Sequence, residues 1–557
     1  MTQVLIIGAG PVGLFLGAEL ARHGIIARVV DQRSGPSTRS KALGVQPRTL
    51  EMFADCGILD EADKRGRRMY GLRMYAAGEE LLHVNLEDLD TAYPHALILP
   101  QYDTEAILEE LCAERGVIVE RDVVCTGLTQ SVDHVEVALG RALTHGREEA
   151  SVERVRVQWV IGCDGAHSTV REALGISYEG ENIGSHIALA DISADVDLVD
   201  DEMHLFFSAE GFTIFIPLPE TGFWRVVFSL PTGTKVTHSH EWFQDLCTKR
   251  LHLPINIGIP TWMADFMVRQ RKADRYREGR VFLAGDAAHC HSPLGGRGMN
   301  TGLQDAYNLA WKLALVLQGV GHTRLLDSYD AERGPVAKDL LDETGFTTKA
   351  ATLTARVPQS IRNLVLSAMS EFESVRAKVA GNTSQLEIHY RKSPIVAENG
   401  SSLLGSVLTA NPLDEIPSVA DWTEFSQAPR AGDRAPDEKV GPSTLHELLR
   451  GPHHTLLLFD GAAPTPAGYA NMHAIANAVR ERYGRYFQAH IVVPHTERPN
   501  EIPANESVVL DTHKTLHARY GAGAECLYVF RPDGHIGYRS QPADSAKLMK
   551  WLARIFL

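Results

Sequence analysis

The sequence has few cysteines, and no two of them form a recognisable pair. The seven cysteines are scattered, odd in number and never spaced as C-x-x-C: Cys56, Cys112, Cys125, Cys163, Cys247, Cys290 and Cys526. This spacing argues against a disulfide framework, a redox-active dithiol and a zinc site, and it is typical of free thiols in a reducing compartment. His289 and His291 have no further ligands at metal spacing, so we expect no metal centre.

Basic residues are fewer than acidic ones, 55 against 70, and long apolar runs are missing. The formal net charge of -15 at pH 7 argues against nucleic acid or an anionic membrane as a partner, since both attract basic surfaces. No apolar run is long enough to span a membrane. The apolar N-terminal run has no basic leader, so we expect a cytoplasmic protein without a signal peptide.

The size and composition are those of a globular protein with several domains. The 557 residues exceed the usual size of a single core, so we expect roughly two to four domains. Hydrophobic residues make up 44% of the chain and charged residues 22%, which favours neither a disordered nor a membrane class.

A glycine-rich turn near the N-terminus predicts a dinucleotide site. Gly8, Gly10 and Gly13 follow the apolar run Val4–Ile7 and open a helix-like stretch, and a second short apolar run ends in Asp31. In such a unit the glycines permit a tight turn, a close approach of the pyrophosphate and close packing of helix on strand. The pyrophosphate binds at the helix N-terminus, and Asp31 is placed to accept hydrogen bonds from a ribose. Alone, this unit does not separate FAD from NAD.

Two later fragments also place an aspartate in the turn after a predicted strand. Asp164 and Gly165 follow a strand predicted over Val157–Ile161, and Gly285-Asp286 follows a strand predicted over Arg280–Ala284. The simpler alternative is that all three fragments are unrelated turns at strand ends. Taken together, they indicate parts of one flavin site.

At these motifs the chain resembles the class A flavoprotein monooxygenases, the single-component aromatic hydroxylases. Within them it resembles the branch of phenol-hydroxylase-like enzymes, aromatic-polyketide hydroxylases and rifampicin monooxygenase. The resemblance implies that Asp164 lies near the FAD pyrophosphate and that Asp286 binds the ribityl chain. It also implies that Gln101 bonds the flavin chain and that Arg39, with Lys41 as a competing candidate, lies on a loop approaching FAD. The cofactor-binding positions assigned on this basis are Gly8, Gly10, Pro11, Val12, Gly13, Asp31, Gln32, Arg39, Lys41, Gln101, Val124, Asp164, Asp286, Pro293, Gly298, Met299 and Asn300. No catalytic side chain is assigned.

The densest motif runs from Gly285 to Asn300 and precedes a long helix predicted over Thr301–Gln318. Glycines at 295, 296 and 298 let backbone approach a flat ring without Cβ clashes. Pro293 fixes the loop and removes a hydrogen-bond donor. The N–H groups that begin the helix would face the isoalloxazine and stabilise negative charge on the reduced flavin.

The predicted fold class is α/β: a FAD-binding Rossmann-like domain with an inserted antiparallel-sheet substrate domain, followed by a thioredoxin-like domain. Alternating, aromatic-rich runs at Met203–Ser208, Phe212–Leu218 and Phe223–Leu230 predict the antiparallel sheet. The predicted boundaries are 1–70, 96–178 and 271–330 for the FAD-binding domain, 71–95 and 179–270 for the substrate domain, 331–400 for a helical segment, 401–440 for a linker and 441–557 for the last domain.

The C-terminal segment has the predicted order βαβαββα, which resembles thioredoxin. Its predicted strands are His454–Phe459, Phe487–Val493, Cys526–Phe530 and Ile536–Tyr538, and its predicted helices are Met472–Tyr483, His513–Tyr520 and Ala543–Phe556. In the helical segment before it, Ser360–Lys378 is the clearest helix. A redox thioredoxin needs paired cysteines, so we expect a structural or dimer-stabilising module in a monomer or homodimer.

The resemblance implies that NADH or NADPH reduces the flavin at a transient site, that O₂ adds at C4a, and that the hydroperoxide hydroxylates a small phenolic or polycyclic aromatic substrate. The protein orients the substrate and excludes water, because the oxidative chemistry belongs to the cofactor. Two alternatives stay open. One is Baeyer–Villiger, dehydrogenating or antibiotic-inactivating flavin chemistry on a similar scaffold, and the other is a flavin-bound scaffold whose tail binds partners.

Overall fold

The computed structural model describes residues 3–38, 40, 42–141, 152–208, 210–231, 233–291, 296–352, 373–400, 419–461 and 465–557. The chain forms two compact units. We call Met1–Tyr307 with Arg333–Leu386 the N-terminal unit, and Asn308–Glu332 with Glu387–Leu557 the C-terminal unit. The helices α7 (Gly298–Leu317) and α8 (Asp327–Thr352) contribute residues to both. No described helix combines the length and the apolar content needed to span a membrane.

The N-terminal unit contains a six-stranded, mostly parallel sheet. In spatial order its strands are β19 (Arg277–Glu278), β20 (Val281–Leu283), β12 (Trp159–Gly162), β1 (Val4–Ile7), β2 (Arg28–Val30) and β8 (Val119–Glu120). Only the edge pair of β19 with β20 is antiparallel. β1 and β12 are buried along their whole length, as in parallel strands covered on both faces.

Helices α1 (Pro11–Arg22) and α4 (Gln101–Glu114) pack against each other in this unit. α1 begins directly after the glycine turn with Pro11. Proline suits this first position because an N–H group there would have no partner within the helix. The smaller elements of the unit are α2 (Pro47–Cys56), α3 (Leu59–Arg65), α5 (Thr169–Ala173), α10 (Glu373–Ser384), β3 (Gly44–Val45), β4 (Arg67–Met69), β7 (Ala96–Ile98), β9 (Val123–Gln130), β10 (Val135–Arg141) and β11 (Glu153–Val157).

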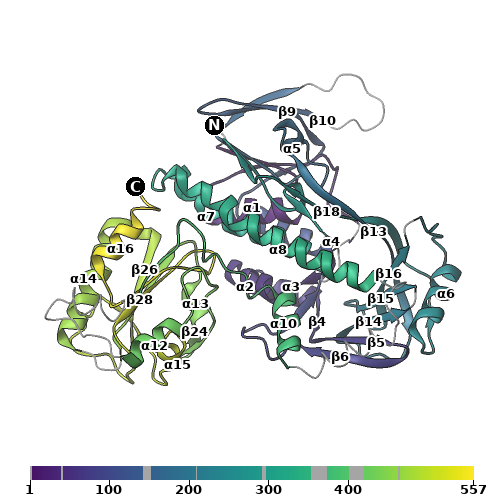
Figure 1. Ribbon diagram of the computed structural model, residues 1–557. Helices are drawn as coiled ribbons and strands as arrows, with labels where there is room; N and C mark the ends of the chain where they lie inside the picture. Colours follow the sequence, from purple (N-terminus) through teal and green to yellow (C-terminus); the bar gives the residue numbers. More distant parts are fainter. Residues whose placement is uncertain are drawn as a thin grey trace. The chain divides into compact units, whose positions relative to one another are not determined.

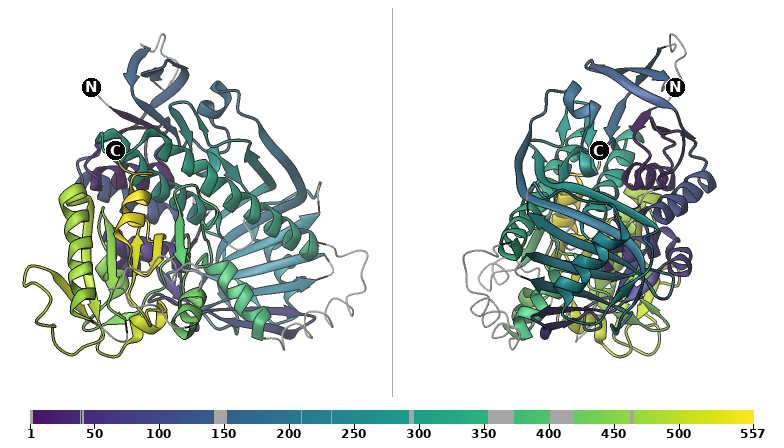
Figure 2. Two further views of the ribbon diagram at one scale, coloured as in Figure 1. Left: turned by 60° about the vertical axis from the view of Figure 1, so that its left-hand side comes forward. Right: turned by 90° about the vertical axis from the view of Figure 1, so that its right-hand side faces the viewer.

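The second large sheet of this unit has nine strands, and Figure 2 shows its long members side by side. In spatial order they are β21 (His289–Cys290), β18 (Trp262–Ala273), β13 (Tyr178–Asp195), β16 (Phe223–Pro231), β15 (Gly211–Pro217), β14 (Glu202–Ser208), β5 (Gly71–Ala76) and β6 (Glu79–Asn85), and β17 (Asn256–Ile257) pairs with β13. Neighbours pair antiparallel except β14 and β5. The three aromatic-rich runs of the sequence form β14, β15 and β16.

The two faces of the nine-stranded sheet bury different clusters. Helix α6 (His240–Leu251) packs on one face, where Phe243 lies among residues such as Phe215 and Trp224. Because successive strand residues point to opposite faces, the second cluster forms on the other face. That cluster includes side chains that are only partly buried, among them Trp262 and Phe266.

The C-terminal unit is built on a six-stranded mixed sheet. Its strands, in spatial order, are β22 (Ala397–Gly400), β29 (Ile536–Gln541), β28 (Cys526–Phe530), β25 (His454–Phe459), β26 (Phe487–Val493) and β27 (Ser507–Leu510). β25, β26 and β27 are parallel, whereas β28 is antiparallel to β25 and β29. β22 pairs with β29 in parallel.

Helices cover both faces of this sheet (Figure 1). Leu456 and Leu458 of β25 pack on the side of α14 (Pro466–Tyr483) and α16 (Ser545–Leu552), together with Trp311 of α7. Leu457 and Phe459 pack on the side of α12 (Val419–Gln427), α13 (Leu445–Leu449) and α15 (Thr515–Arg519). A short hairpin of β23 (Lys439–Val440) and β24 (Ser443–Thr444) precedes α13.

The sequence predicted the strands of the C-terminal unit better than its helices. β25, β26 and β28 have the predicted bounds, but α15 and α16 are shorter than predicted, and β22 and β27 were not foreseen. Residues 419–427 of the predicted linker form α12, because Phe425 is buried in an apolar cluster. The helix predicted over Ser360–Lys378 lies largely outside the described residues, and only its last residues belong to α10.

Candidate active site

The three motifs of the sequence follow three neighbouring parallel strands. β1 pairs with β12, and β12 pairs with β20, in parallel. These strands end at Ile7, Gly162 and Leu283, so the glycine turn, the Asp164 loop and the Asp286 loop leave the sheet at the same edge. Ligands bind at the carboxyl edge of parallel sheets in open α/β folds. This edge is the candidate active site.

The glycine turn is packed tightly on one side and open on the other. A Cβ on Gly8, whose φ is +105°, would lie 2.3 Å from the Cys163 carbonyl oxygen, and a Cβ on Gly13 would lie 1.9 Å from that of Gly8. A Cβ on Gly10 would meet no described atom within 4 Å. No described side chain caps the N-terminus of α1, which begins here. The turn therefore offers free N–H groups and space for an anion.

The Asp286 loop lies against the first turn of α1. A Cβ on Gly285 (φ +61°) would come within 2.9 Å of Val12 Cγ2, and a Cβ on Gly302 within 2.6 Å of the same atom. Close packing of Val12, Gly285 and Gly302 thus joins the first motif, the third motif and the start of α7. No sequence motif had indicated a special role for Gly302.

Asp31 ends β2 and holds the glycine turn in place. Its carboxylate accepts hydrogen bonds from the Ala9 amide at 2.6 Å and the Arg33 amide at 2.7 Å, and the Arg33 guanidinium contacts both of its oxygens. Burial favours the neutral acid, but the hydrogen bonds from Arg33 and Ala9 outweigh burial and lower the pKa of Asp31. Its predicted companion Gln32 is exposed.

Arg121 is a residue of this region that sequence reasoning missed. Its Nη1 lies 4.0 Å from Asp31 Oδ2, and its side chain is 13% exposed. Among the described residues, its Nε and Nη1 have no hydrogen-bond partner. Buried donors normally have partners, so these two atoms fit a site that is completed by a ligand.

Gln101 is placed on α4 as expected, but its side chain is engaged within the protein. Its Oε1 accepts a hydrogen bond from the Ala42 amide at 3.3 Å, and its Nε2 donates to Glu105 at 3.0 Å. Its backbone amide donates to Ser40 Oγ at 2.9 Å. Gln101 thus holds the loop that contains Arg39 and Lys41, both of which lie outside the described residues.

The Asp164 carboxylate accepts hydrogen bonds at the N-terminus of a helix. One oxygen accepts a hydrogen bond from Ser168 Oγ at 2.5 Å and the other from the Val170 amide at 3.2 Å, at the N-terminus of α5. Burial raises the pKa of Asp164. Val124, the other position assigned in this region, lies half-buried in β9.

Arg171 connects the second motif to the third, which the sequence did not reveal. Its buried guanidinium donates to the Ala166 carbonyl at 2.9 Å and to the Ala287 carbonyl at 3.0 Å. It also lies over the Tyr178 ring, 3.9 Å from the centroid. The Tyr178 hydroxyl in turn donates to the Asp286 carbonyl at 2.8 Å. These contacts fix the backbone around Asp286, whose side chain is exposed.

Helix α7 begins at Gly298, three residues before the predicted start at Thr301. Asn300 is fully buried, and its side chain bonds to protein backbone: Oδ1 accepts from the Gln46 amide at 2.9 Å, and Nδ2 donates to the Gly44 and Gly296 carbonyls. Asn300 therefore anchors the loop before α7, and Met299 beside it is half-buried. Pro293 and Gly295 lie outside the described residues.

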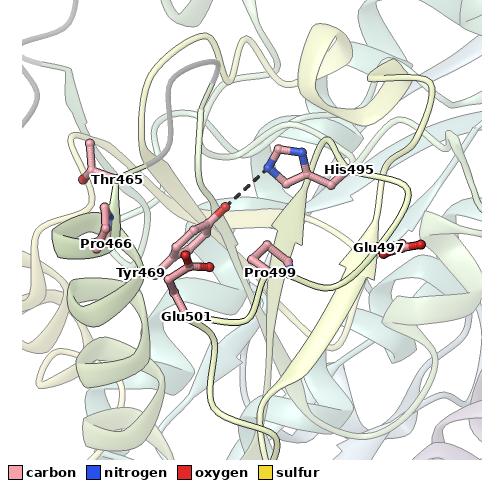
Figure 3. Close-up of a pocket in the computed structure, with 7 residues that line it drawn as sticks. All are labelled: Thr465, Pro466, Tyr469, His495, Glu497, Pro499 and Glu501. Carbon is pink, nitrogen blue, oxygen red and sulfur yellow. Dashed lines mark hydrogen bonds between the residues drawn. The ribbon is translucent and has the colours of Figure 1, made fainter.

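The C-terminal unit contains a separate cavity of about 310 Å³. In Figure 3, Tyr469 points toward His495, and its hydroxyl lies 3.5 Å from the ring Nε2. The same hydroxyl donates to the buried Asp460 at 2.9 Å. None of the residues that line the cavity is a cysteine, and Cys526 is a buried free thiol whose pKa is raised by burial.

Metal binding has no support in the part of the chain that the structure describes. No cluster of three or more His, Cys, Asp or Glu residues there has the geometry to hold an ion. His289 instead bonds to Asp305, with 2.7 Å between Nε2 and Oδ2.

Known proteins resemble this chain over most or all of its length. Residues 1–344 match the family model described as FAD binding domain. The 6-methylpretetramide 4-monooxygenase of Streptomyces rimosus is 35% identical over 100% of this chain and 94% of its own. The rifampicin monooxygenase of Streptomyces venezuelae is 34% identical over 70% of this chain and 80% of its own. A solved ternary complex of aklavinone-11 hydroxylase with FAD and aklavinone has a TM-score of 0.74 and 25% identity, and the match covers 99% of this chain and 98% of that one.

Proposed function

The chain belongs to the family of FAD-dependent aromatic monooxygenases, and from this premise we propose that it hydroxylates a phenolic or polycyclic aromatic substrate with electrons from NADH or NADPH. FAD is its cofactor, and the resemblance found in the sequence is confirmed. The observation that best supports the proposal is the meeting of three motif loops at one sheet edge, beside the open side of Gly10.

The proposed FAD contacts follow from what each loop offers. The uncapped N-terminus of α1 binds the pyrophosphate at Gly10, Pro11 and Val12. The N–H groups of Gly10 and Val12 and the helix dipole favour an anion there, and Pro11, which has no N–H, contributes only its fixed backbone. Asp31 binds the adenosine ribose, and the exposed Asp286 carboxylate binds the ribityl chain. When bound, the flavin supplies reduction by the nicotinamide and activation of O₂.

The substrate-binding region that we propose is the nine-stranded sheet, residues 71–95 and 179–270. Its face opposite α6 includes the partly buried side chains of Trp262 and Phe266, which suit a flat apolar ring. The buried Arg225 lies 4.9 Å from the centroid of the Trp262 ring and donates to the Ser40 carbonyl at 2.8 Å. This arginine links the sheet to the loop that Gln101 holds. The protein's part is to orient the substrate and exclude water.

For the C-terminal unit we propose a thioredoxin-like fold without redox activity. Three parallel strands, β25, β26 and β27, and the antiparallel pair β28 and β29 support the fold assignment. The buried and unpaired Cys526 supports a structural or dimer-stabilising role. The whole protein would act in the cytoplasm as a monomer or homodimer.

A second candidate function is inactivation of an antibiotic, or Baeyer–Villiger insertion, on the same scaffold. The similarity to a rifampicin monooxygenase favours the first of these. Labelled O₂ distinguishes the outcomes: hydroxylation places one labelled oxygen on a ring carbon, whereas insertion places it within an ester. Dehydrogenation gives product without label.

The test of the proposed function is a screen of phenols and polycyclic aromatics for stimulated NADH and NADPH oxidation by the FAD-loaded protein. We expect at least one aromatic compound to accelerate oxidation and to acquire an oxygen atom from O₂. In anaerobic stopped-flow measurements, the same compound should speed flavin reduction, because a ligand that favours one of two flavin arrangements shifts the population toward it. Product formation with equal reduction rates would refute this gating, and absence of any stimulated oxidation would favour the scaffold alternative.

A further inference from the structure

Asp305 is a buried carboxylate in α7 that the sequence did not single out. Its Oδ2 accepts a hydrogen bond from the Gly285 amide at 3.1 Å and another from His289 Nε2 at 2.7 Å. Gly285 and His289 are the two ends of the short segment that contains Asp286. A single carboxylate oxygen therefore fixes both ends of the loop from which Asp286 projects.

The other oxygen of Asp305 ties this loop to the start of α7. Oδ1 accepts a hydrogen bond from Arg333 Nε at 2.7 Å, and Arg333 Nη2 donates to the Thr301 carbonyl at 3.0 Å. Both side chains are buried, with exposed fractions of 1% for Asp305 and 0% for Arg333. The arrangement joins the Asp286 loop to the first turns of α7, which begins at Gly298.

The ionisation of Asp305 determines which atoms of this cluster donate hydrogen bonds and which accept them. Burial would favour the neutral acid, but His289 and Arg333 outweigh it and lower the pKa of Asp305. A carboxylate only accepts hydrogen bonds, so the proton of His289 lies on Nε2. Its Nδ1 has no hydrogen-bond partner among the described residues, so the contact with Asp305 sets the orientation of the ring.

We propose that Asp305 is a positioning residue of the flavin site, which holds the Asp286 loop at a fixed place relative to the N-terminus of α7. The proposal rests on the proposed binding of the ribityl chain by Asp286. FAD spans both elements in that assignment, so a loop that is free to shift would satisfy only one contact at a time. Asp305 acts through the backbone and does not itself touch the cofactor.

The test is a double-mutant cycle on FAD binding by the apoprotein, measured by titration of flavin fluorescence, with Asp305→Asn and Asp286→Ala. Asparagine keeps the size of the side chain but presents an NH₂ group, so it cannot accept all three hydrogen bonds or balance Arg333. We expect Asp305→Asn alone to raise the Kd for FAD roughly tenfold to a hundredfold. In the Asp286→Ala background the same change should raise the Kd only about threefold or less, because the contact that it positions is gone.

A control comes from another carboxylate that contacts the same helix. Asp55 of α2 accepts a hydrogen bond from the hydroxyl of Tyr307 in α7 at 2.5 Å, so Asp55→Asn also removes a carboxylate bonded to α7 but leaves the Asp286 loop untouched. It should lower thermal stability without changing the Kd for FAD. Equal effects of Asp305→Asn in both backgrounds, or an equal loss of FAD affinity in Asp55→Asn, would overturn the positioning role.

Two further readouts separate this proposal from the function. Asp305→Asn should change the visible absorption spectrum of the bound flavin, which a loss of overall stability alone would not do. If Asp305→Asn does not fold, His289→Gln releases one end of the loop and enters the same cycle. Absence of turnover with intact coupling would refute the proposed reaction only, whereas unchanged FAD binding in Asp286→Ala would refute the proposed coupling.

Discussion

Two buried clusters of charged residues contain similar side chains but bond to different kinds of groups. In the N-terminal unit, Asp305 and Arg333 both bond to backbone groups: Asp305 to the Gly285 amide and Arg333 to the Thr301 carbonyl. In the C-terminal unit, Glu332 accepts hydrogen bonds from Lys312 Nζ at 2.7 Å and Arg531 Nη1 at 2.7 Å. The first cluster fixes the backbone beside an exposed carboxylate, and the second bonds mainly to other side chains.

The second cluster shows what a purely structural network looks like. Lys312, Glu332 and Arg531 are all fully buried, and Asp533 pairs with Arg531 and accepts from Trp311 Nε1 at 3.2 Å. Burial opposes ionisation of Glu332, but Arg531 and Lys312 outweigh it and lower the pKa of Glu332. Burial and perturbed pKa values are common to both clusters. Contact with the backbone of a motif distinguishes the Asp305 cluster, to which we assign a role in the flavin site.

Glu332→Gln should give the largest effect and should confine it to stability. The change leaves Lys312 and Arg531 buried with one carboxylate between them, which costs about 3–5 kcal/mol in the free energy of unfolding. Urea unfolding followed by circular dichroism measures this loss. FAD affinity of the folded protein should stay unchanged, and a raised Kd would erase the distinction between the clusters.

The control for this variant is Glu398→Gln in the same unit. Glu398 pairs with Arg430 and Arg539, and its side chain is 31% exposed. Because water screens a pair of this kind, we expect a cost of about 1 kcal/mol or less. A similar loss in both variants would show that burial of the charges is not what makes Glu332 important.

Asp286→Ala should show the opposite pattern, with weaker FAD binding and unchanged stability of the apoprotein. The exposed carboxylate would lose a charge-assisted hydrogen bond to the ribityl chain, worth roughly 1.5–3 kcal/mol of binding free energy. Flavin release during ultrafiltration and fluorescence titration report the change. Glu172→Ala, which removes another exposed carboxylate of the N-terminal unit, should leave the Kd unaltered. Full FAD retention by Asp286→Ala would refute its assignment.

The parts of the site that could be predicted have a local signature. Gly8, Gly10, Gly13 and Asp286 each follow an apolar strand in a short motif, so sequence alone assigned them to one flavin site. Asp305 and Arg333 stand singly in helices, where a charged residue predicts a solvent-facing side chain. Only the packing of distant segments shows that both are buried. A sequence motif also does not predict where a side chain points: Asn300 lies in the first turn of α7, and its side chain bonds to backbone groups of the protein.

The strands of the fold also divide into those with a local sequence pattern and those without one. β1 is a continuous apolar run, and β25 contains the apolar run Leu456–Phe459; the bounds of both strands were predicted correctly. β22 has the sequence Ala-Glu-Asn-Gly, without apolar alternation, and it becomes a strand because β29 offers an edge for pairing. Such a strand depends on a partner distant in sequence, so no local pattern announces it.

Cys526→Ser should give the smallest effect and should separate structure from redox chemistry in the C-terminal unit. Cys526 pairs with Phe459 across β28 and β25 and lies in the apolar cluster that includes Tyr528. Burial raises the pKa of its thiol, so it stays protonated and unreactive. A buried hydroxyl in its place should cost about 1–2 kcal/mol of unfolding free energy and leave hydroxylation per folded molecule unchanged. Cys526→Ala, which adds no polar group, should cost less than serine. If both variants keep the fold but lose turnover, the C-terminal unit takes part in the reaction. The distinction between a structural C-terminal unit and an N-terminal unit that holds the active site would then be wrong.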